Sequence, residues 1–438
     1  MHKRIKVVWL CGFTNEYVFN ELKPHYGKFE LFIRKLLRKP LVIRCKELAV
    51  WVTNAIHEFE KFTNEIELHI VAAQGNLGDE IVEFNHNGIY YHIVNDELNY
   101  FSSAVARKIF PQKENSDYIQ NRKRFSLLIN RINPDVVHLI GAENPNYSLG
   151  ILDVKNSIPT IVQLQTLMQM PGFEDGYPIS HRSFLYRSGV EKTILENATY
   201  IASAAKTYIE YIRQHINKSA VCLNTTLALA EPINLSESKK EFDFVYFSKE
   251  VEKAGDYALE AFVLAFKKYP WITMDIIGDC SESYKDGLKN ILKAAGAEKA
   301  VKFEGVLPTH EDVIKQVRKS RFAVIPMKVD LMTGTIRESM ANGLPVCTTK
   351  TSSTLRQNSI RKCLLLSESG DHNALAENMC RLLNDNDLGD TLRNNAAQSL
   401  SERDSNEKRM EKWVQMYKAV LLYENEDVPI PQALLHAL

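Results

Sequence analysis

The sequence contains few cysteines and no arrangement of them that suggests a shared role. The seven cysteines are scattered along 438 residues, are odd in number, and form neither a C-x-x-C pair nor a cysteine–histidine ligand spacing. This pattern excludes a disulfide framework and a zinc site of the usual spacing. Scattered free thiols fit a reducing compartment, so a cytoplasmic location is expected.

Long hydrophobic runs and an excess of charge of one sign are also missing. No run approaches the roughly 20 apolar residues that cross a bilayer. Lys6 interrupts the apolar run that follows His2-Lys3-Arg4, so a signal peptide is not expected. Lys plus Arg and Asp plus Glu both number 54, which argues against bulk nucleic-acid binding. We therefore expect a protein that is neither exported nor integral to a membrane.

A glycine-rich dinucleotide fingerprint is missing as well. The first expected strand, Ile5 to Leu10, is followed by a turn with the single glycine Gly12. Because no G-x-G-x-x-G follows this strand, a dehydrogenase is not favoured. Gly12 is a candidate substrate contact, with a plain strand-to-helix turn as an equal alternative.

The most informative stretch runs from Val324 to Thr349 and reads VIPMKVDLMTGTIRESMANGLPVCTT. The apolar run Phe322 to Pro326 predicts a buried strand, and Thr335 to Asn342 predicts a short helix that Gly343 ends. A second strand follows over Leu344 to Thr348. Strand, loop, helix and strand form one unit of a parallel sheet, in which ligands bind beyond the carboxyl ends of the strands.

The loop and the start of this helix have the chemistry of a phosphate and sugar site. Gly334 lets the backbone approach a ligand closely, and the N–H groups at Thr335 favour an anion. Two acids, Asp330 and Glu338, flank this junction. A nucleotide diphosphate is the natural candidate ligand. Alternatively, Thr335 to Glu338 is a capping box, in which Glu338 only satisfies the backbone N–H of Thr335.

Strands and helices alternate regularly after a polar linker at 232–241. Strands are expected at 242–247, 273–277, 301–304, 322–326, 344–348 and 363–366, and helices near 256–268, 284–295, 309–319, 335–342, 371–384 and 388–400. This alternation predicts a Rossmann-like parallel sheet. A last amphipathic helix is expected over 402–424, with Trp413 and Tyr417 in its apolar stripe.

Together these motifs resemble those of the retaining, family-4-type glycosyltransferases of GT-B fold, the group 1 glycosyl transferases, in their bacterial surface-polysaccharide form. Asp330 and Glu338 match the family's acid–seven–acid motif, with Asp in place of the usual Glu, and ESMANGLPV matches the run that follows. Further matches are Ser248 to Asp256 on G-R-x-x-x-E-K-G, Ile276 to Asp279 on I-V-G-x-G, Phe303 to Gly305 on F-x-G, and Pro134 to His138 on PDVVH. The resemblance is continuous over 240–400, patchy over 130–230 and weak before that.

The resemblance implies an α/β protein of GT-B fold, in which two Rossmann-like parallel-sheet domains face each other across a cleft. It implies an acceptor-side domain over 1–232, a nucleotide-sugar domain over 241–402, and a terminal helix in 403–438 that crosses back to the first domain. It further implies a metal-independent hexosyltransferase without a cofactor. Its donor would be a nucleotide-diphosphate sugar such as a UDP-sugar, and its acceptor a glycan or lipid-linked oligosaccharide of capsule, lipopolysaccharide or exopolysaccharide biosynthesis.

The resemblance also implies roles for single residues. Glu338 would bind the ribose hydroxyls, Asp330 would lie against the donor sugar, and Lys253 would neutralise the leaving diphosphate. Ser248 stands where the family has arginine. The expected nucleotide contacts are Ser248, Lys253, Gly278, Thr333, Gly334, Thr335 and Glu338.

On the acceptor side, Gln165 stands where many relatives have a histidine that contacts the donor sugar. Glutamine cannot act as an acid or base near neutral pH, so Gln165 is expected to orient the sugar, and it completes the catalytic group with Asp330 and Lys253. His138 and Glu143 are candidate substrate contacts at the end of their strand. A histidine that is simply satisfied at a strand end is the alternative for His138.

Two rival functions stay open because Asp330, Ser248 and Gln165 depart from the family pattern. One is an inactive transferase-like subunit that binds donor or a partner without turnover. The other is a different GT-B enzyme, such as a sugar-nucleotide epimerase. A phosphorylase would need a pyridoxal lysine site, and nothing in the sequence marks one.

A basic segment at 23–46 interleaves lysines and arginines with apolar residues at roughly helical spacing, and Glu30 is its single acid. Such a segment can rest on an anionic membrane surface, which would give peripheral contact with the inner face of the cytoplasmic membrane. The alternative, the solvated face of a helix packed on the sheet, is favoured. Pro40 limits the segment to a broken helix.

Overall fold

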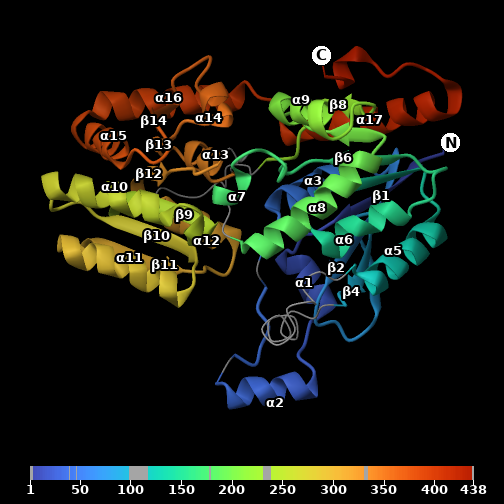
Figure 1. Ribbon diagram of the computed structural model, residues 1–438, viewed down its shortest axis with the longest axis horizontal. Coiled ribbons are helices and arrows are strands. Elements are labelled where there is room, and N and C mark those ends of the chain that lie inside the picture. Colours follow the sequence, from blue (N-terminus) through green and yellow to red (C-terminus); the bar gives the residue numbers. More distant parts are fainter. Residues whose placement is uncertain are drawn as a thin grey trace. The chain divides into compact units, whose positions relative to one another are not determined.

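The computed structural model describes residues 3–38, 40–45, 47–97, 117–176, 179–229, 238–329 and 334–436. The chain divides into two compact units (Figure 1). Unit 1 comprises Met1–Met170, Ser180–Leu229 and Ser405–Leu438, and unit 2 comprises Pro171–Ile179 and Ala230–Asp404. The expected linker at 232–241 lies largely outside the described residues.

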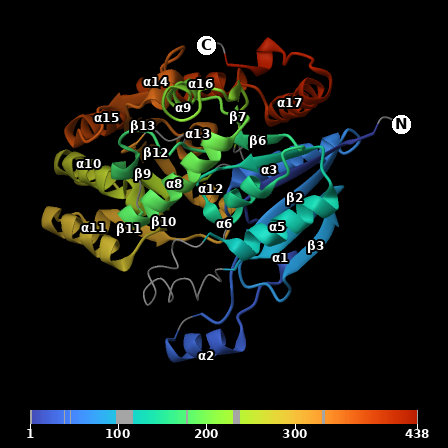
Figure 2. The same ribbon diagram turned by 45° about the vertical axis from the view of Figure 1, so that its right-hand side comes forward.

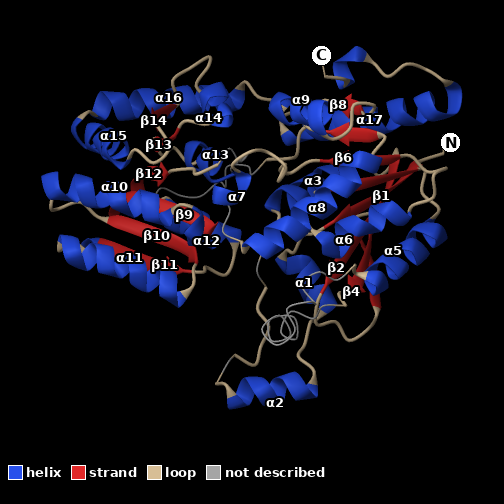
Figure 3. Cartoon of the chain, in the orientation of Figure 1, coloured by secondary structure: helices blue, strands red, loops and turns tan. Residues whose placement is uncertain are grey.

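Unit 1 is built on a sheet that has eight strands among its described residues (Figures 1 and 3). In spatial order the strands are β3 (Ile81–His86), β4 (Ile89–Asn95), β2 (Ile66–Gln74), β1 (Ile5–Cys11), β5 (Val136–Ile140), β6 (Thr160–Gln163), β7 (Tyr200–Ala202) and β8 (Val221–Leu223). From β4 to β8 every neighbouring pair is parallel. The chain order changes direction between β1 and β5.

The edge strand β3 departs from the expected parallel sheet, because it pairs with β4 in antiparallel register. The two strands are joined by Asn87 and Gly88, whose φ angles are 49° and 82°. A two-residue hairpin of this kind needs positive φ at both positions, which Asn-Gly supplies at little cost. The Asn-Gly pair is therefore the sequence signal for this antiparallel edge.

Helices cover both faces of the unit 1 sheet, because alternate strand residues point to opposite sides. Val7, Trp9 and Cys11 belong to one hydrophobic cluster, and Val8 and Leu10 to another. The helices are α1 (Glu16–Leu22), α2 (Lys28–Leu36), α3 (Val50–Phe59), α5 (Ile119–Ile132), α6 (Pro145–Ser148), α8 (His181–Asn197), α9 (Lys206–His215) and α17 (Asn406–Glu426).

The last helix, α17, is part of the unit 1 core. The indole N–H of Trp9 donates to the hydroxyl of Tyr417 at 2.9 Å, and that of Trp413 donates to the carbonyl of Thr226 at 2.9 Å. The Trp9 and Trp413 rings meet edge to face with centroids 5.3 Å apart. The C-terminal helix therefore shares buried aromatic contacts with the first strand of the chain.

Unit 2 is a parallel sheet with six strands in its described part. Its spatial order is β11 (Val301–Gly305), β10 (Met274–Asp279), β9 (Phe242–Glu250), β12 (Ser320–Ile325), β13 (Val346–Thr349) and β14 (Leu364–Ser367). Its helices are α7 (Phe173–Gly176), α10 (Gly255–Lys268), α11 (Glu282–Ala295), α12 (His310–Val317), α13 (Gly334–Ala341), α14 (Ser352–Gln357), α15 (His372–Asn384) and α16 (Asn386–Ser401). Each strand and helix expected between 242 and 400 is present, with bounds that agree within a few residues.

Helix α2 lies within the basic segment, and Figure 2 shows it from a second direction. Phe32 is 63% exposed and Leu36 is 70% exposed. The favoured expectation, that this segment packs its apolar side chains on the sheet, is therefore wrong for these residues. Among the described helices of both units, none is long and apolar enough to cross a membrane.

Gly278, near the end of β10, lies close to the backbone of Ser248 on β9. Its φ is 140°, and a Cβ atom at this position would lie 1.8 Å from the carbonyl oxygen of Ser248. The pairing of the two strands is irregular between Ile277 and Asp279. Only glycine fits this position without moving the backbone of β9.

Replacing Gly278 with alanine should lower the free energy of unfolding by about 2 kcal/mol or more, because backbone atoms of β9 must shift. Urea denaturation measures this change. Gly287→Ala is the matched control, since Gly287 lies within α11 and an added Cβ there meets nothing within 4 Å. The control should be stabilised by about 1 kcal/mol, the gain of alanine over glycine in a helix. Equal stability of wild type and Gly278→Ala would contradict the close approach.

Candidate functional site

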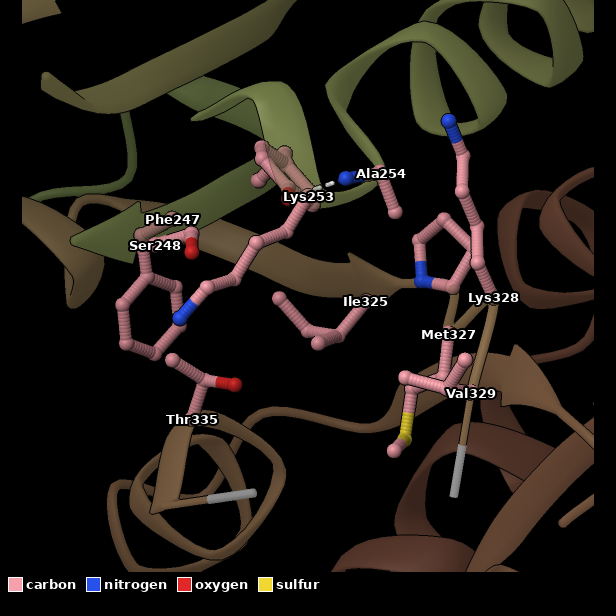
Figure 4. Close-up of a pocket in the computed structure, with 11 residues that line it drawn as sticks. Phe247, Ser248, Lys253, Ala254, Ile325, Met327, Lys328, Val329 and Thr335 are labelled. Carbon is pink, nitrogen blue, oxygen red and sulfur yellow. Dashed lines mark hydrogen bonds between the residues drawn. The ribbon is translucent and has the colours of Figure 1, made fainter. Parts of the chain in front are cut away.

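A pocket of about 380 Å³, counted with its open side, lies in unit 2 (Figure 4). It is lined by Tyr246, Phe247 and Ser248 on β9, Lys253 and Ala254 in the following turn, Ile325 to Val329 at and after the end of β12, and Thr335 on α13. The strand order of unit 2 changes direction between β9 and β12. Parallel sheets bind ligands at this place, because the loops of the two strands leave in opposite directions.

Two lysines line the pocket and point in different directions. Lys253 lines the pocket, and its side chain extends in a different direction from that of Lys328 (Figure 4). This side chain is 29% exposed, and its Nζ lies 3.6 Å from a carboxylate oxygen of Glu250. Lys328 points out of the pocket and donates to Asp256 at 2.7 Å. Lys253 therefore supplies positive charge to the pocket interior.

Tyr246 holds the turn that carries Lys253. Its hydroxyl accepts a hydrogen bond from the backbone N–H of Ala254 at 3.2 Å and donates one to the carbonyl of Val251 at 3.4 Å. Burial raises the pKa of Tyr246, so the hydroxyl keeps its proton. Gly255 completes the turn, since a Cβ there would lie 2.5 Å from the Val251 side chain.

Glu338 lies on α13 and faces a histidine from α12. Its side chain is 14% exposed, and one carboxylate oxygen is 3.7 Å from Nε2 of His310. Burial raises the pKa of Glu338, and the nearby His310 acts in the opposite direction. The described part of α13 starts at Gly334, so Thr335 lies within the helix and not at an N-cap position. The capping-box alternative for Glu338 therefore does not apply.

The other site residues expected in unit 2 are placed as follows. Ser248 lines the pocket with Lys253 and Thr335. Gly278 lies next to the backbone carbonyl of Ser248. A Cβ on Gly334 would be 3.5 Å from the Glu338 carboxylate. Asp330 and Thr333 lie outside the described residues. Among the residues described in both units, no group of three or more histidine, cysteine or acidic side chains could hold a metal ion.

A second group of predicted residues meets at the carboxyl ends of β1, β5 and β6 in unit 1. Tyr147 is its centre, and a Cβ on Gly12 would lie 2.7 Å from the Tyr147 ring. A Cβ on Gly141 would lie 2.9 Å from the Tyr147 hydroxyl. Gln165 and Tyr147 both donate to the carbonyl of Ile140, each at 3.1 Å. The two glycines thus leave room for the Tyr147 side chain, and the Ile140 carbonyl accepts hydrogen bonds from both Tyr147 and Gln165.

Glu143 follows β5 and belongs to a buried acid pair. Asn144 donates to its carboxylate at 3.0 Å, and Arg187 donates to its backbone carbonyl at 2.8 Å. Glu191 on α8 accepts from the backbone N–H of Gln169 at 3.2 Å. Burial raises the pKa of Glu143, while burial and the charge of Glu143 raise the pKa of Glu191 to about 8. Glu191 is therefore largely protonated at neutral pH.

His138 lies neither with the residues of the unit 2 pocket nor with the unit 1 residues around Tyr147. It lies in the middle of β5, is 0% exposed, and its Nδ1 is 2.6 Å from the Tyr417 hydroxyl. The Trp413 ring lies 4.6 Å from the imidazole, centroid to centroid. Burial lowers the pKa of His138 to about 3, so the ring is neutral. These surroundings give it a packing role, and its contact with substrate stays a prediction.

Sequence reasoning missed the side chains that support these groups. Tyr246 and Tyr147 carry no local signal, since Tyr246 falls inside an apolar strand and Tyr147 follows an ordinary turn. His310 and Arg187 act through residues distant in the chain. Only the fold brings these four residues to the sites that they hold.

Comparisons with known proteins agree with this geometry. Residues 201–399 match the family model described as "Glycosyl transferases group 1". No curated protein sequence matches the chain. The pocket in unit 2 lies inside the region that matches this family model.

Three solved structures are similar over nearly the whole chain. The sucrose-phosphate synthase from Thermosynechococcus elongatus is 15% identical, with a TM-score of 0.65, covering 95% of this chain and 99% of that one. The Anabaena Alr3699/HepE protein, in complex with UDP and glucose, is 13% identical, with a TM-score of 0.62 and coverage of 95% and 100%. The UDP-forming α,α-trehalose-phosphate synthase from Burkholderia vietnamiensis is 11% identical, with a TM-score of 0.61 and coverage of 95% and 100%. At these identities the likeness shows the fold, and the expectation of a GT-B fold is confirmed.

The buried acid pair predicts a pH-dependent stability. Folded Glu191 keeps its proton until its pKa of about 8, whereas the unfolded chain loses it near the ordinary value of 4.5. The folded state binds more protons between these values, so the contribution of Glu191 to stability is complete at low pH and is lost as the pH rises towards 8. Urea denaturation across this range should show a smaller loss for Glu191→Gln than for wild type.

Glu196→Gln is the matched control, because Glu196 lies on the same helix with a side chain that is 46% exposed. Its stability should follow wild type across the pH range. The same pH dependence in wild type and Glu191→Gln would contradict a raised pKa at Glu191.

Proposed function

We propose that this protein is a retaining glycosyltransferase. It moves a hexose from a nucleotide-diphosphate sugar, with UDP as the nucleotide we favour, to a glycan or lipid-linked oligosaccharide acceptor. The pathway would be the biosynthesis of bacterial capsule, lipopolysaccharide or exopolysaccharide. UDP is favoured because it is named for two of the similar structures, the Anabaena protein and the trehalose-phosphate synthase.

The observation that carries the proposal is that the Lys253 side chain lines the pocket. Its ammonium group enters a pocket at the switch point of a parallel sheet, inside the region that matches group 1 glycosyl transferases. Breaking the bond between sugar and diphosphate leaves negative charge on the phosphate. A fixed cation in a partly closed pocket stabilises that charge, and Tyr246 fixes the turn beneath it.

The remaining unit 2 residues bind the nucleotide in this proposal. Ser248 and Thr335 offer hydroxyl groups beside Lys253, and Gly278 lets the chain pass close to the ligand. Glu338 binds the ribose hydroxyls. Its carboxylate oxygens would accept hydrogen bonds from the two hydroxyl groups of the ribose. Thr333 and Gly334 complete the phosphate contacts through the start of α13.

The reaction would proceed on one face of the sugar, with retention at the anomeric carbon. The acceptor hydroxyl attacks as the bond to the diphosphate breaks, and the leaving phosphate oxygen takes the hydroxyl proton. Asp330 and Gln165 orient the sugar, while Gly12 and Glu143 are the candidate substrate contacts. No protein base, metal ion or cofactor is required by this route.

A donor-binding protein without turnover is the second candidate. It is favoured by Ser248, which replaces a family arginine and leaves one cation fewer beside the diphosphate. The two candidates differ in one observable, which is release of nucleotide from a bound donor.

Nucleotide release should be measured with a panel of UDP-, GDP- and ADP-sugars. We expect slow hydrolysis of one donor, lowered at least about a hundredfold in Lys253→Ala, because a charge that stabilises the leaving group is lost. Glu338→Ala should weaken donor binding by roughly tenfold or more, since the ribose contacts are lost.

Lys350→Ala and Glu368→Ala are the matched controls, because these residues form an ion pair at the surface of unit 2. Both should keep wild-type hydrolysis. Donor binding without release, even with lipid-linked acceptors added, would favour the second candidate. Absence of binding to every donor would contradict both.

Tyr246→Phe tests the turn beneath Lys253. The variant removes the acceptor for the Ala254 N–H, so we expect kcat/KM for donor hydrolysis to fall by about tenfold while the fold is kept. Tyr269→Phe is the control, since it removes a hydroxyl that accepts from Asn384 elsewhere in unit 2. Equal kinetics of the two variants would argue against a positioning role for Tyr246.

A further inference from the structure

The outward face of α2 combines apolar and basic side chains. Lys28, Leu31, Phe32, Lys35 and Leu36 follow one another at the spacing of a single helix face, and all five are exposed. A helix of a soluble domain normally turns its apolar face towards the core. Here the apolar face is turned towards solvent.

The inward face of the same helix is polar. Glu30 and Arg34 are 8% and 9% exposed, and Nε of Arg34 donates to the Glu30 carboxylate at 3.0 Å. The guanidinium group also lies 3.6 Å from the centre of the Tyr26 ring and donates to the carbonyl of Pro40 at 3.1 Å. The single acid of the segment is therefore paired and removed from the surface.

The exposed apolar surface continues beyond the helix. Leu37, Leu41 and Val42 are 54%, 49% and 73% exposed, and the cations Arg38 and Arg44 are exposed beside them in the sequence. No described residue from 23 to 48 belongs to a hydrophobic cluster of unit 1. Figures 1 and 2 both draw α2 apart from the unit 1 sheet. The apolar side chains thus have no partner in the core.

We propose that the surface formed by residues 28, 31, 32, 35–38, 41, 42 and 44, here called the α2 surface, binds a membrane that contains anionic lipid. Its leucines and Phe32 would enter the boundary between headgroups and acyl chains, and its lysines and arginines would meet lipid phosphates. Charge decides between partners, because a second copy of the chain would bring the same positive surface and be repelled. The inference goes beyond the proposed transfer and does not depend on the donor pocket.

Vesicle sedimentation with the full chain tests this inference. We expect the protein to sediment with phosphatidylcholine vesicles that contain phosphatidylglycerol and to stay in solution with phosphatidylcholine alone. Added salt should weaken the binding, because the cations meet phosphates at an exposed surface.

Two double variants separate the apolar and the charged contributions. Phe32→Ser with Leu36→Ser should lower vesicle affinity by about tenfold or more, since two inserting side chains are lost. Lys28→Gln with Lys35→Gln should lower it by roughly tenfold or more, at about 1 kcal/mol per charge near an anionic surface. Leu127→Ser with Ile360→Ser is the matched control, because these side chains are 68% and 83% exposed elsewhere, and it should bind as wild type does.

Donor hydrolysis in solution should be unchanged in all three double variants, which keeps this test separate from that of the proposed function. Absence of binding to anionic vesicles would overturn the inference, as would equal losses in the control and the α2 variants. Self-association of wild type that the Phe32 and Leu36 substitutions abolish would also overturn it, because a second copy would then be the occupant.

Discussion

The reversal of strand order between β9 and β12 is the constraint on which the candidate donor site depends. Chain connections leave these neighbouring strands in opposite directions, so their loops separate and leave a pocket at the carboxyl edge of the sheet. Two further features act on β9 and on the turn that follows it. Gly278 lets β10 approach β9 at Ser248, and the Tyr246 hydroxyl ties the turn after β9. Lys253 owes its direction to this turn.

Unit 1 repeats the same reversal between β1 and β5, with a different result. There the Tyr147 ring lies beside Gly12, Tyr147 and Gln165 both donate to the Ile140 carbonyl, and a buried acid pair lies nearby. The edge of one sheet carries the Lys253 side chain, and the edge of the other carries the buried acids Glu143 and Glu191 with the Arg187 guanidinium group.

Helix α2 differs from the helices that pack on the two sheets, because it exposes apolar side chains and buries charged ones. In both sheets, alternating strand residues place apolar side chains in the core, as the hydrophobic effect requires. In α2 the pairing of Glu30 with Arg34 stabilises the inward polar face, and Phe32 and Leu36 remain in solvent. Such an exposed apolar patch normally marks a surface that is covered by something else.

The sequence by itself determined the unit 2 sheet, the glycine positions and the acid spacing around Glu338, because strand and helix periodicity and turn chemistry are local properties of the chain. Its Asn-Gly pair also specified the β3–β4 hairpin. Only the tertiary structure decided that His138 is enclosed by α17, that Glu338 faces His310, and that Glu191 shares a buried site with Glu143. These contacts join residues far apart in the chain, and a local sequence pattern does not predict which distant side chain will lie beside a given residue. The burial of a site and the charges around it depend on these distant side chains, so both are determined by the fold.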